Sequence, residues 1–484
     1  MGKNRLIPTS GRTYAVWMYM LGLAEPFLAE CLVLFGIPNV EYYQDTFRNL
    51  RILSMTGLVV YLWMARPGEK RPAPAAFWVL TAGFAWIVLR FLLDSELFLR
   101  CGPGGVWDRA FEAWFLYFPC ALLLTKEELS RCVRFLAVIW GVSVGAAAVL
   151  GIYCAATNSH YYTPAGTVIG IREYDGVYRL WLTSYPTVSA EQLLITAAFA
   201  MLALFMAKRN WQKLCFGILL APLFVALGLT DGRTAMAAFG LMAAVAVFVG
   251  MLRLPMKRGV LRYGAGLAAA LLTVALVYGA CGRVSGWFRV NADALPEGSR
   301  RTAALTQAED RILLAAVNDA ADMPKLSFLM APAQEGITIH RQIEGTLSGR
   351  TQLWSCVLKA LANNDQNMLL VGRTPRDYEE ILQSYGFPDT QRHVHNIYLQ
   401  VLMEWGLPGF AVMAVFLALL AIAAFRLMLR DGLPFWERFL PAPALAMLAV
   451  EMLDCFMRLN AEHSALQAGF LFMGLIVGVE QKNR

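Results

Sequence analysis

The sequence predicts an all-α integral membrane protein with about 12 transmembrane helices and a large, mainly helical extracytoplasmic domain between the ninth and tenth spans. Three observations support this prediction. Of the 484 residues, 58% are hydrophobic and only 16% are charged, whereas a soluble protein carries roughly 25% charged residues. Apolar runs of about 20 residues, the length that crosses a bilayer as a helix, recur along the chain. Lys and Arg gather in alternate loops between these runs.

The apolar runs give the individual spans. In lipid the backbone has no water to hydrogen-bond, so each run is expected to be helical. The expected spans are 13–37, 47–65, 74–93, 107–124, 132–154, 187–207, 213–229, 234–252, 262–281, 408–427, 438–457 and 464–480. The first run follows Lys3, Arg5 and Arg12 but contains Glu25 and Glu30, which favours a retained helix over a cleaved signal peptide.

The positive charge follows the topology. Clusters such as Lys208/Arg209/Lys213 and Arg426/Arg430/Arg438 all fall on one side of the predicted spans. By the positive-inside rule this side and both termini are cytoplasmic. The net charge of +7 therefore reflects membrane topology, and no nucleic-acid partner is expected. The expected location is the bacterial cytoplasmic (inner) membrane, with the active face extracytoplasmic.

Two extracytoplasmic segments interrupt the pattern of short loops, at about 155–186 and 282–394. The second is too long for a connector, and it contains amphipathic stretches near 299–322, 350–363 and 375–385. The sequence leaves the order within 282–345 open. The expected division is spans 1 to 9 in 1–281, the extracytoplasmic domain in 282–407, and spans 10 to 12 in 408–484.

Three motifs lie near the predicted outer face. The longest is His393-Val-His395-Asn396-Ile-Tyr-Leu-Gln400-Val-Leu-Met-Glu404-Trp-Gly-Leu-Pro-Gly409, directly before the tenth span. The others are Leu347-Ser-Gly-Arg350-Thr-Gln-Leu-Trp354 and Thr230-Asp-Gly-Arg233-Thr234. Together these motifs resemble the O-antigen ligase and O-antigen polymerase superfamily of bacterial membrane glycosyltransferases, over roughly 180–430.

The residue types fit transfer of a sugar from a lipid pyrophosphate. Arg stays charged and forms bidentate bonds to phosphate, which suits Arg233 and Arg350 to the pyrophosphate. His is the usual base for a hydroxyl proton near neutral pH, and His395 is the candidate. Each residue also has an ordinary structural reading: Arg233 as an interfacial charge, Arg350 as a partner of Glu344, and His395 as a hydrogen-bonded structural residue.

Supporting residues follow from the same motifs. Asn396 and Glu404 are expected to orient the site, and His393 ranks below His395 because the family places its histidine directly before the Asn. Arg179 is a third candidate phosphate contact. It precedes Pro186, but Thr187 stands where the family often has Asn, which departs from the pattern.

The resemblance implies a glycan donor carried on undecaprenyl pyrophosphate and an acceptor that is a glycan or is lipid-linked. It also implies transfer with inversion and without a metal or cofactor. The motifs do not separate ligase from polymerase, or identify the sugars. The alternative is a transporter or flippase of lipid-linked oligosaccharide, which would use intramembrane charges. The sequence leaves the role of such charges open at Glu25, Glu30, Glu451, Asp454 and Arg458.

Overall fold

The computed structural model describes most of the chain outside the long late loop. The described residues are 9–34, 40–65, 73–93, 110–157, 159–163, 168–174, 177–182, 186–254, 259–292, 350–363, 369–373, 377–387, 394–453 and 464–484. The predicted amphipathic stretch at 299–322 and the undecided order within 282–345 lie largely or wholly outside these residues.

Helices make up nearly all of the described structure. The first half contains α1 (Thr9–Leu34), α2 (Val40–Met64), α3 (Ala75–Leu93), the π-helix η1 (Glu112–Tyr117), α6 (Cys120–Leu123), α7 (Lys126–Thr157), α8 (Pro186–Met206) and α9 (Asn210–Thr230). The second half contains α10 (Arg233–Met251), α11 (Gly259–Ala292), α14 (Arg350–Ala362), α16 (Asp377–Ser384), α17 (Ile397–Leu429), α18 (Phe435–Phe439), α19 (Pro441–Glu451) and α20 (Ser464–Asn483).

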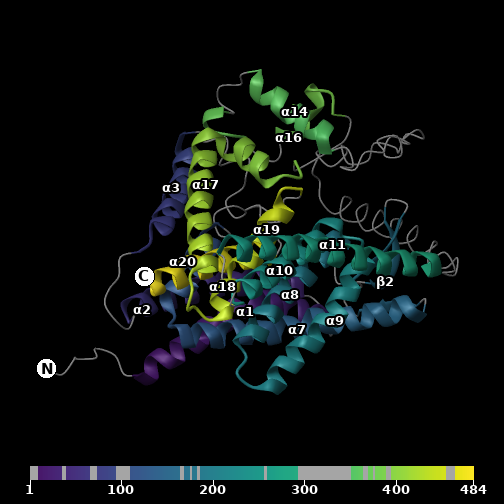
Figure 1. Ribbon diagram of the computed structural model, residues 1–484. Coiled ribbons are helices and arrows are strands. Elements are labelled where there is room, and N and C mark those ends of the chain that lie inside the picture. Colours follow the sequence, from purple (N-terminus) through teal and green to yellow (C-terminus); the bar gives the residue numbers. More distant parts are fainter. Residues whose placement is uncertain are drawn as a thin grey trace.

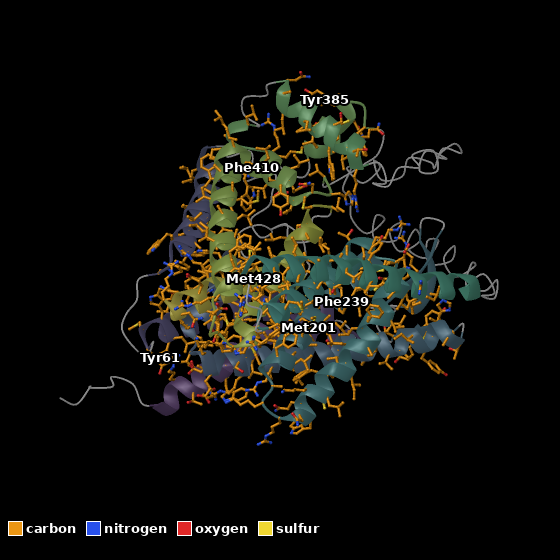
Figure 2. All side chains as sticks on the ribbon, viewed as in Figure 1. Tyr61, Met201, Phe239, Tyr385, Phe410 and Met428 are labelled. Carbon is orange, nitrogen blue, oxygen red and sulfur yellow. The ribbon has the colours of Figure 1, made fainter. Side chains whose placement is uncertain are left out.

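The helices form one large body and one small one. In Figure 1, α7, α8, α10 and α11 run across the view, α3 and α17 run upright beside them, and α14 and α16 lie above. The large body has a continuous apolar core, and Figure 2 shows Met201, Phe239 and Met428 inside it. The small body, which includes Leu353 and Leu382, has a core of its own that α17 helps to build. It therefore rests on the start of α17.

Six helices within the described residues are long and apolar enough to cross a bilayer. They are Lys126–Thr157, Pro186–Met206, Asn210–Thr230, Arg233–Met251, Val260–Val284 and Ile397–Leu429. The chain is therefore a multi-span helical membrane protein, whereas the total of about 12 spans stays a prediction. The amphipathic stretches expected at 350–363 and 375–385 are the helices α14 and α16.

The all-α prediction missed a small sheet in the segment 155–186. Strands β1 (Tyr161–Tyr162), β2 (Val168–Tyr174) and β3 (Val177–Trp181) pair antiparallel in the order β1-β2-β3. In the β2–β3 pair, Arg172 stands opposite Arg179 and Ile171 opposite Leu180. Ile171 and Leu180 are buried, so one face of the hairpin adds to the core. The segment is rich in Tyr and β-branched residues, which favour strands.

Helix α17 breaks at Gly406, where φ is 67° and ψ is −173°. Residues with a side chain are essentially excluded from this backbone conformation. The break frees carbonyl groups that a continuous helix would have bonded. Two side chains of α3 bond to them: Trp86 Nε1 donates to the Trp405 oxygen at 2.8 Å, and Arg90 Nη1 donates to the Glu404 oxygen. The bend in α17 is thus held by α3.

Substituting Gly406 tests this bend. In Gly406→Ala the new Cβ would lie 2.6 Å from the Leu370 oxygen, in addition to the backbone strain. We expect a loss of about 1–3 kcal/mol in stability, seen as a lower thermal midpoint of the purified protein in detergent. The control is Gly217→Ala on α9, where a Cβ meets nothing within 4 Å. An unchanged midpoint for Gly406→Ala would contradict the account.

Candidate functional site

His395 has a left-handed backbone, with φ of 50°. Asp231, in the motif at the start of α10, has φ of 51°. No other non-glycine residue in the part of the chain that the structure describes has positive φ. Such conformations cost energy and persist where the surroundings enforce them, often at functional sites. Both examples here lie in motifs that the sequence singled out.

Two hydrogen bonds fix the residue before His395. The Val394 amide donates to Gln400 Oε1 at 2.9 Å, and the Val394 carbonyl accepts from Trp354 Nε1 at 2.9 Å. Val394 and Gln400 are both fully buried. Leaving a buried polar group without a hydrogen-bond partner lowers the stability of the fold by about 1–3 kcal/mol. These two bonds therefore hold the backbone leading into His395.

Asn396, the residue after His395, is held in place by three hydrogen bonds of its side chain. Its side-chain oxygen accepts from the amides of Tyr398 and Leu399, both at 3.0 Å, and so caps the start of α17. Its Nδ2 donates to the Met452 oxygen just beyond α19, at 3.0 Å. The Asn of the motif thus joins α17 to the end of α19. The supporting role of Asn396 stays a prediction, and these bonds are the contacts through which it would act.

Glu404 reaches the same segment through Gln400. Gln400 Nε2 donates to Glu404 Oε1 at 2.6 Å, while Gln400 Oε1 accepts from Val394. The two side chains lie one turn apart on the same face of α17. Both are buried. Glu404 therefore orients Gln400, which in turn holds the backbone before His395.

Arg350 is the first residue of α14. Trp354 lies four residues later and shares its helix face. Because Trp354 bonds to Val394, this face of α14 is turned toward the His395 segment. The structure thus brings the helix that carries Arg350 to the motif that carries His395.

Arg233 is the first residue of α10, and its side chain is exposed. Arg179, on β3, lies near this point: its Nε is 4.0 Å from Asp231 Oδ2. The Arg179 side chain is 22% exposed and that of Asp231 is 8% exposed. Arg179 therefore lies near Asp231, which stands at the junction of α9 and α10 two residues before Arg233.

Helix α19 joins the two groups of site residues. It packs against α10, the helix that begins with Arg233, and against α17, which His395 and Asn396 precede. Convergence of Arg233, Arg350 and His395 on one pocket stays a prediction. His393 lies outside the described residues.

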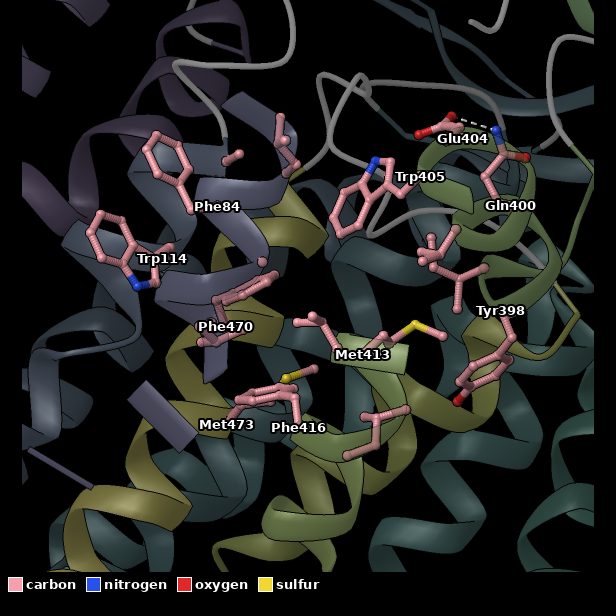
Figure 3. Close-up of a pocket in the computed structure, with 18 of the residues that line it drawn as sticks. Phe84, Trp114, Tyr398, Gln400, Glu404, Trp405, Met413, Phe416, Phe470 and Met473 are labelled. Atoms are coloured by element: carbon pink, nitrogen blue, oxygen red, sulfur yellow. Dashed lines mark hydrogen bonds between the residues drawn. The ribbon is translucent and has the colours of Figure 1, made fainter. Parts of the chain in front are cut away.

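An apolar cavity of about 120 Å³ opens beside the start of α17. Figure 3 shows Phe84, Trp114 and Phe470 on one side of the cavity and Tyr398, Gln400 and Glu404 on the opposite side. Met413, Phe416 and Met473 lie between these two groups. The cavity lies between α3, η1, α17, α19 and α20. Gln400 thus borders the cavity and also bonds to the His395 segment, and Glu404, which bonds to Gln400, lines the cavity beside it.

The intramembrane charges receive a partial explanation. Glu25 pairs with Arg51 at 2.8 Å, and Arg51 also pairs with Glu112 at 2.5 Å. Glu451 is fully buried and lines the apolar cavity. The side chain of Glu30, and all of Asp454 and Arg458, lie outside the described residues. Within the described residues, no three His, Cys, Asp or Glu side chains gather closely enough to hold a metal ion.

Some of the residues that shape the site carried no assigned role in the sequence. Gln400 and Trp354 stood inside the motifs, and their spacing from Glu404 and Arg350, four residues in each case, is the helical repeat that could have indicated a shared face. Trp86 and Arg90 gave no such signal, because their contacts cross more than 300 residues of chain.

The fold and these motifs define a multi-span helical membrane protein with polar groups gathered at helix ends. Residues 218–414 match the family model described as O-antigen ligase. The chain therefore carries an O-antigen ligase domain over these residues, which confirms the resemblance seen in the sequence. The match includes Arg233, Arg350, His395, Asn396 and Glu404 but not Arg179. Among curated proteins, none matches the chain.

The variant Gln400→Leu tests how the His395 segment is held. Losing both bonds of Gln400 leaves the Val394 amide without its acceptor, and a tenfold faster hydrogen–deuterium exchange at this amide is expected, on the order of 1.4 kcal/mol. Gln383→Leu on α16, which is exposed, serves as the control. Equal exchange in wild type and Gln400→Leu would show that Gln400 does not restrain the segment.

Proposed function

We propose that this protein transfers a glycan from an undecaprenyl-pyrophosphate donor to an acceptor hydroxyl on the extracytoplasmic face of the cytoplasmic membrane. The O-antigen ligase domain indicates a member of the O-antigen ligase and polymerase family, whose substrates are lipid-linked glycans. The observation that carries the finer proposal is the position of His395. It stands at the start of α17, where polar groups meet an apolar cavity. A lipid-linked sugar needs both surroundings at once.

The two arginines at helix starts support pyrophosphate binding. Arg233 opens α10 and Arg350 opens α14, and neither helix has an acidic residue in its first turn. A helix N-terminus carries unbonded amides and partial positive charge, and favours anions. Arg at this position adds a permanent charge and a bidentate donor. Arg179 would act as a third contact, or hold Asp231 in place beside Arg233.

The reaction then needs one proton acceptor. The acceptor oxygen attacks the anomeric carbon, the bond from that carbon to the phosphate oxygen breaks, and the pyrophosphate leaves with the electron pair. His395 takes the hydroxyl proton as general base, and attack from the opposite side inverts the anomeric centre. The arginines stabilise the charge that grows on the leaving pyrophosphate.

The apolar cavity suits the lipid end of the donor. Its walls are mostly aliphatic, aromatic and thioether side chains, and it extends along α17 from the first turn to the region of Met413 and Phe416. An isoprenoid chain would pack against these apolar side chains, away from water. Neither the cavity nor the motifs select between a ligase and a polymerase.

The role of His395 is tested with a synthetic undecaprenyl-pyrophosphate oligosaccharide and purified protein in EDTA. His395→Asn is the preferred variant because Asn tolerates the left-handed backbone; His395→Ala accompanies it. Loss of a general base is expected to slow release of undecaprenyl pyrophosphate by about 10²- to 10⁴-fold. The control is His160→Asn, at a histidine bonded to the Ile171 oxygen in the small sheet.

If both His395 variants released undecaprenyl pyrophosphate as fast as wild type, His395 would not be the base and this mechanism would fail. Wild-type activity that disappears in EDTA would contradict transfer without a metal. The length distribution of the glycan product separates polymerase from ligase.

The lipid cavity is tested by filling it. Met413→Trp should raise the KM about tenfold for a donor with a full-length polyprenyl chain, with little effect on a donor whose lipid is one or two isoprene units long. Val415→Trp is the matched control, because Val415 lies two residues away and is 51% exposed outside the cavity lining. Equal effects of Met413→Trp on both donors would argue against lipid in this cavity.

A further inference from the structure

Three arginines surround one short turn between α17 and α18. We name Arg253, Arg262 and Arg438 the arginine cluster. Arg253 Nη2 donates to the Leu433 oxygen at 3.1 Å. Arg262 Nη2 lies 4.0 Å from Asp431 Oδ2, and Arg438 Nη1 lies 3.8 Å from Asp431 Oδ1. The cluster therefore has contributions from the turn after α10, the start of α11 and α18.

The positive charge of the cluster is only partly balanced. Asp431 is the one carboxylate paired with it among the described residues, and Asp431 is 73% exposed. Both distances to Asp431 exceed hydrogen-bond length, and such an exposed ion pair contributes little. The nearby Glu437 is engaged elsewhere: it accepts from Lys126 Nζ at 2.9 Å and from Asn483 Nδ2 at 2.6 Å. Three guanidinium groups against one carboxylate leave an excess of two positive charges.

Arg438 supplies an unused donor in a buried position. It is only 3% exposed, and its Nε donates to the Met428 oxygen at 2.8 Å. Its Nη2 has no hydrogen-bond partner in the described structure, and the same is true of Arg262 Nε. A buried N–H without an acceptor is costly, more so when it belongs to a charged group. An acceptor from outside the chain would remove this cost.

We propose that the arginine cluster binds a phosphate group. A phosphate offers several oxygens to guanidinium forks at once, and its negative charge matches the excess at the cluster. This site is separate from the one proposed for the donor. The straight part of α17 after Gly406 is about 35 Å long, with His395 before one end of the helix and Asp431 beyond the other. In Figure 1, α18 lies at the foot of α17 while α14 and α16 lie near its top.

The surroundings favour a lipid headgroup as the source of the phosphate. Next to Arg262 along α11, Val260 is 88% exposed and Leu261 is 63% exposed. Leu254, beside Arg253, is 43% exposed. These apolar side chains would contact acyl chains while the arginines reach the headgroup, the usual arrangement at a membrane interface. The cytoplasmic leaflet, where the positive-inside rule puts this loop, is rich in anionic lipids.

Native mass spectrometry of the full-length protein in detergent tests the proposal. The protein is titrated with phosphatidylglycerol, and with phosphatidylcholine as a lipid without net charge. A thermal shift with inorganic phosphate, against chloride at equal ionic strength, tests a soluble source. The variants are Arg262→Gln and Arg438→Gln, and Arg426→Gln is the control. Arg426 lies at the same end of α17, pairs with Glu480 at 3.5 Å and is 56% exposed.

We expect phosphatidylglycerol to bind more tightly than phosphatidylcholine, and each cluster variant to bind it about fivefold more weakly, as loss of one near-surface charge predicts. Arg426→Gln should bind it as wild type does. If only inorganic phosphate stabilises the protein, and Arg262→Gln abolishes this, the phosphate comes from a soluble ligand. Arg262→Gln decides the matter if Arg438→Gln fails to fold. The proposal would be overturned if Arg262→Gln bound phosphatidylglycerol as tightly as wild type does and responded to inorganic phosphate in the same way.

Discussion

The left-handed backbone of His395 is the constraint around which this site is arranged. The residue holds its conformation because both of its neighbours are fixed: Val394 by Gln400 and Trp354, and Asn396 by its cap on α17 and its bond beyond α19. These contacts draw together α14, α17 and α19. Without these contacts, His395 would be expected to relax to a less strained backbone conformation.

The bend at Gly406 also helps to arrange the His395 segment, because it sets the direction of the first turns of α17. It lets the first turns of α17 leave the line of the rest of the helix, so that Gln400 bonds to the His395 segment while it also lines the cavity with Met413 and Phe416. The freed carbonyls would be costly in an apolar interior, and α3 supplies Trp86 and Arg90 to bond them. The polar motif and the apolar cavity thus depend on one another through a single helix.

Much of this was predictable from sequence where the signal was local. Apolar runs placed helices such as α8 and α10 within a residue or two of their ends, and amphipathic spacing indicated α14. The motifs alone indicated Arg233, Arg350 and His395 as candidate site residues. The small sheet was missed because its strands are short and an all-α fold was expected. Long-range partners such as Arg90 for Glu404 follow from packing, and no spacing rule predicts them. Whether the two groups of site residues meet stays a prediction.

We propose that one site holds the donor pyrophosphate between Arg233 and Arg350, with His395 facing the acceptor. Cryo-electron microscopy of the full-length protein with a non-transferable undecaprenyl-pyrophosphate glycan tests it most directly. We expect phosphate oxygens within hydrogen-bond distance of both guanidinium groups, the lipid in the cavity beside Met413, and the His395 imidazole near the anomeric carbon. A pyrophosphate bound away from both arginines, or a donor remote from His395, would contradict it.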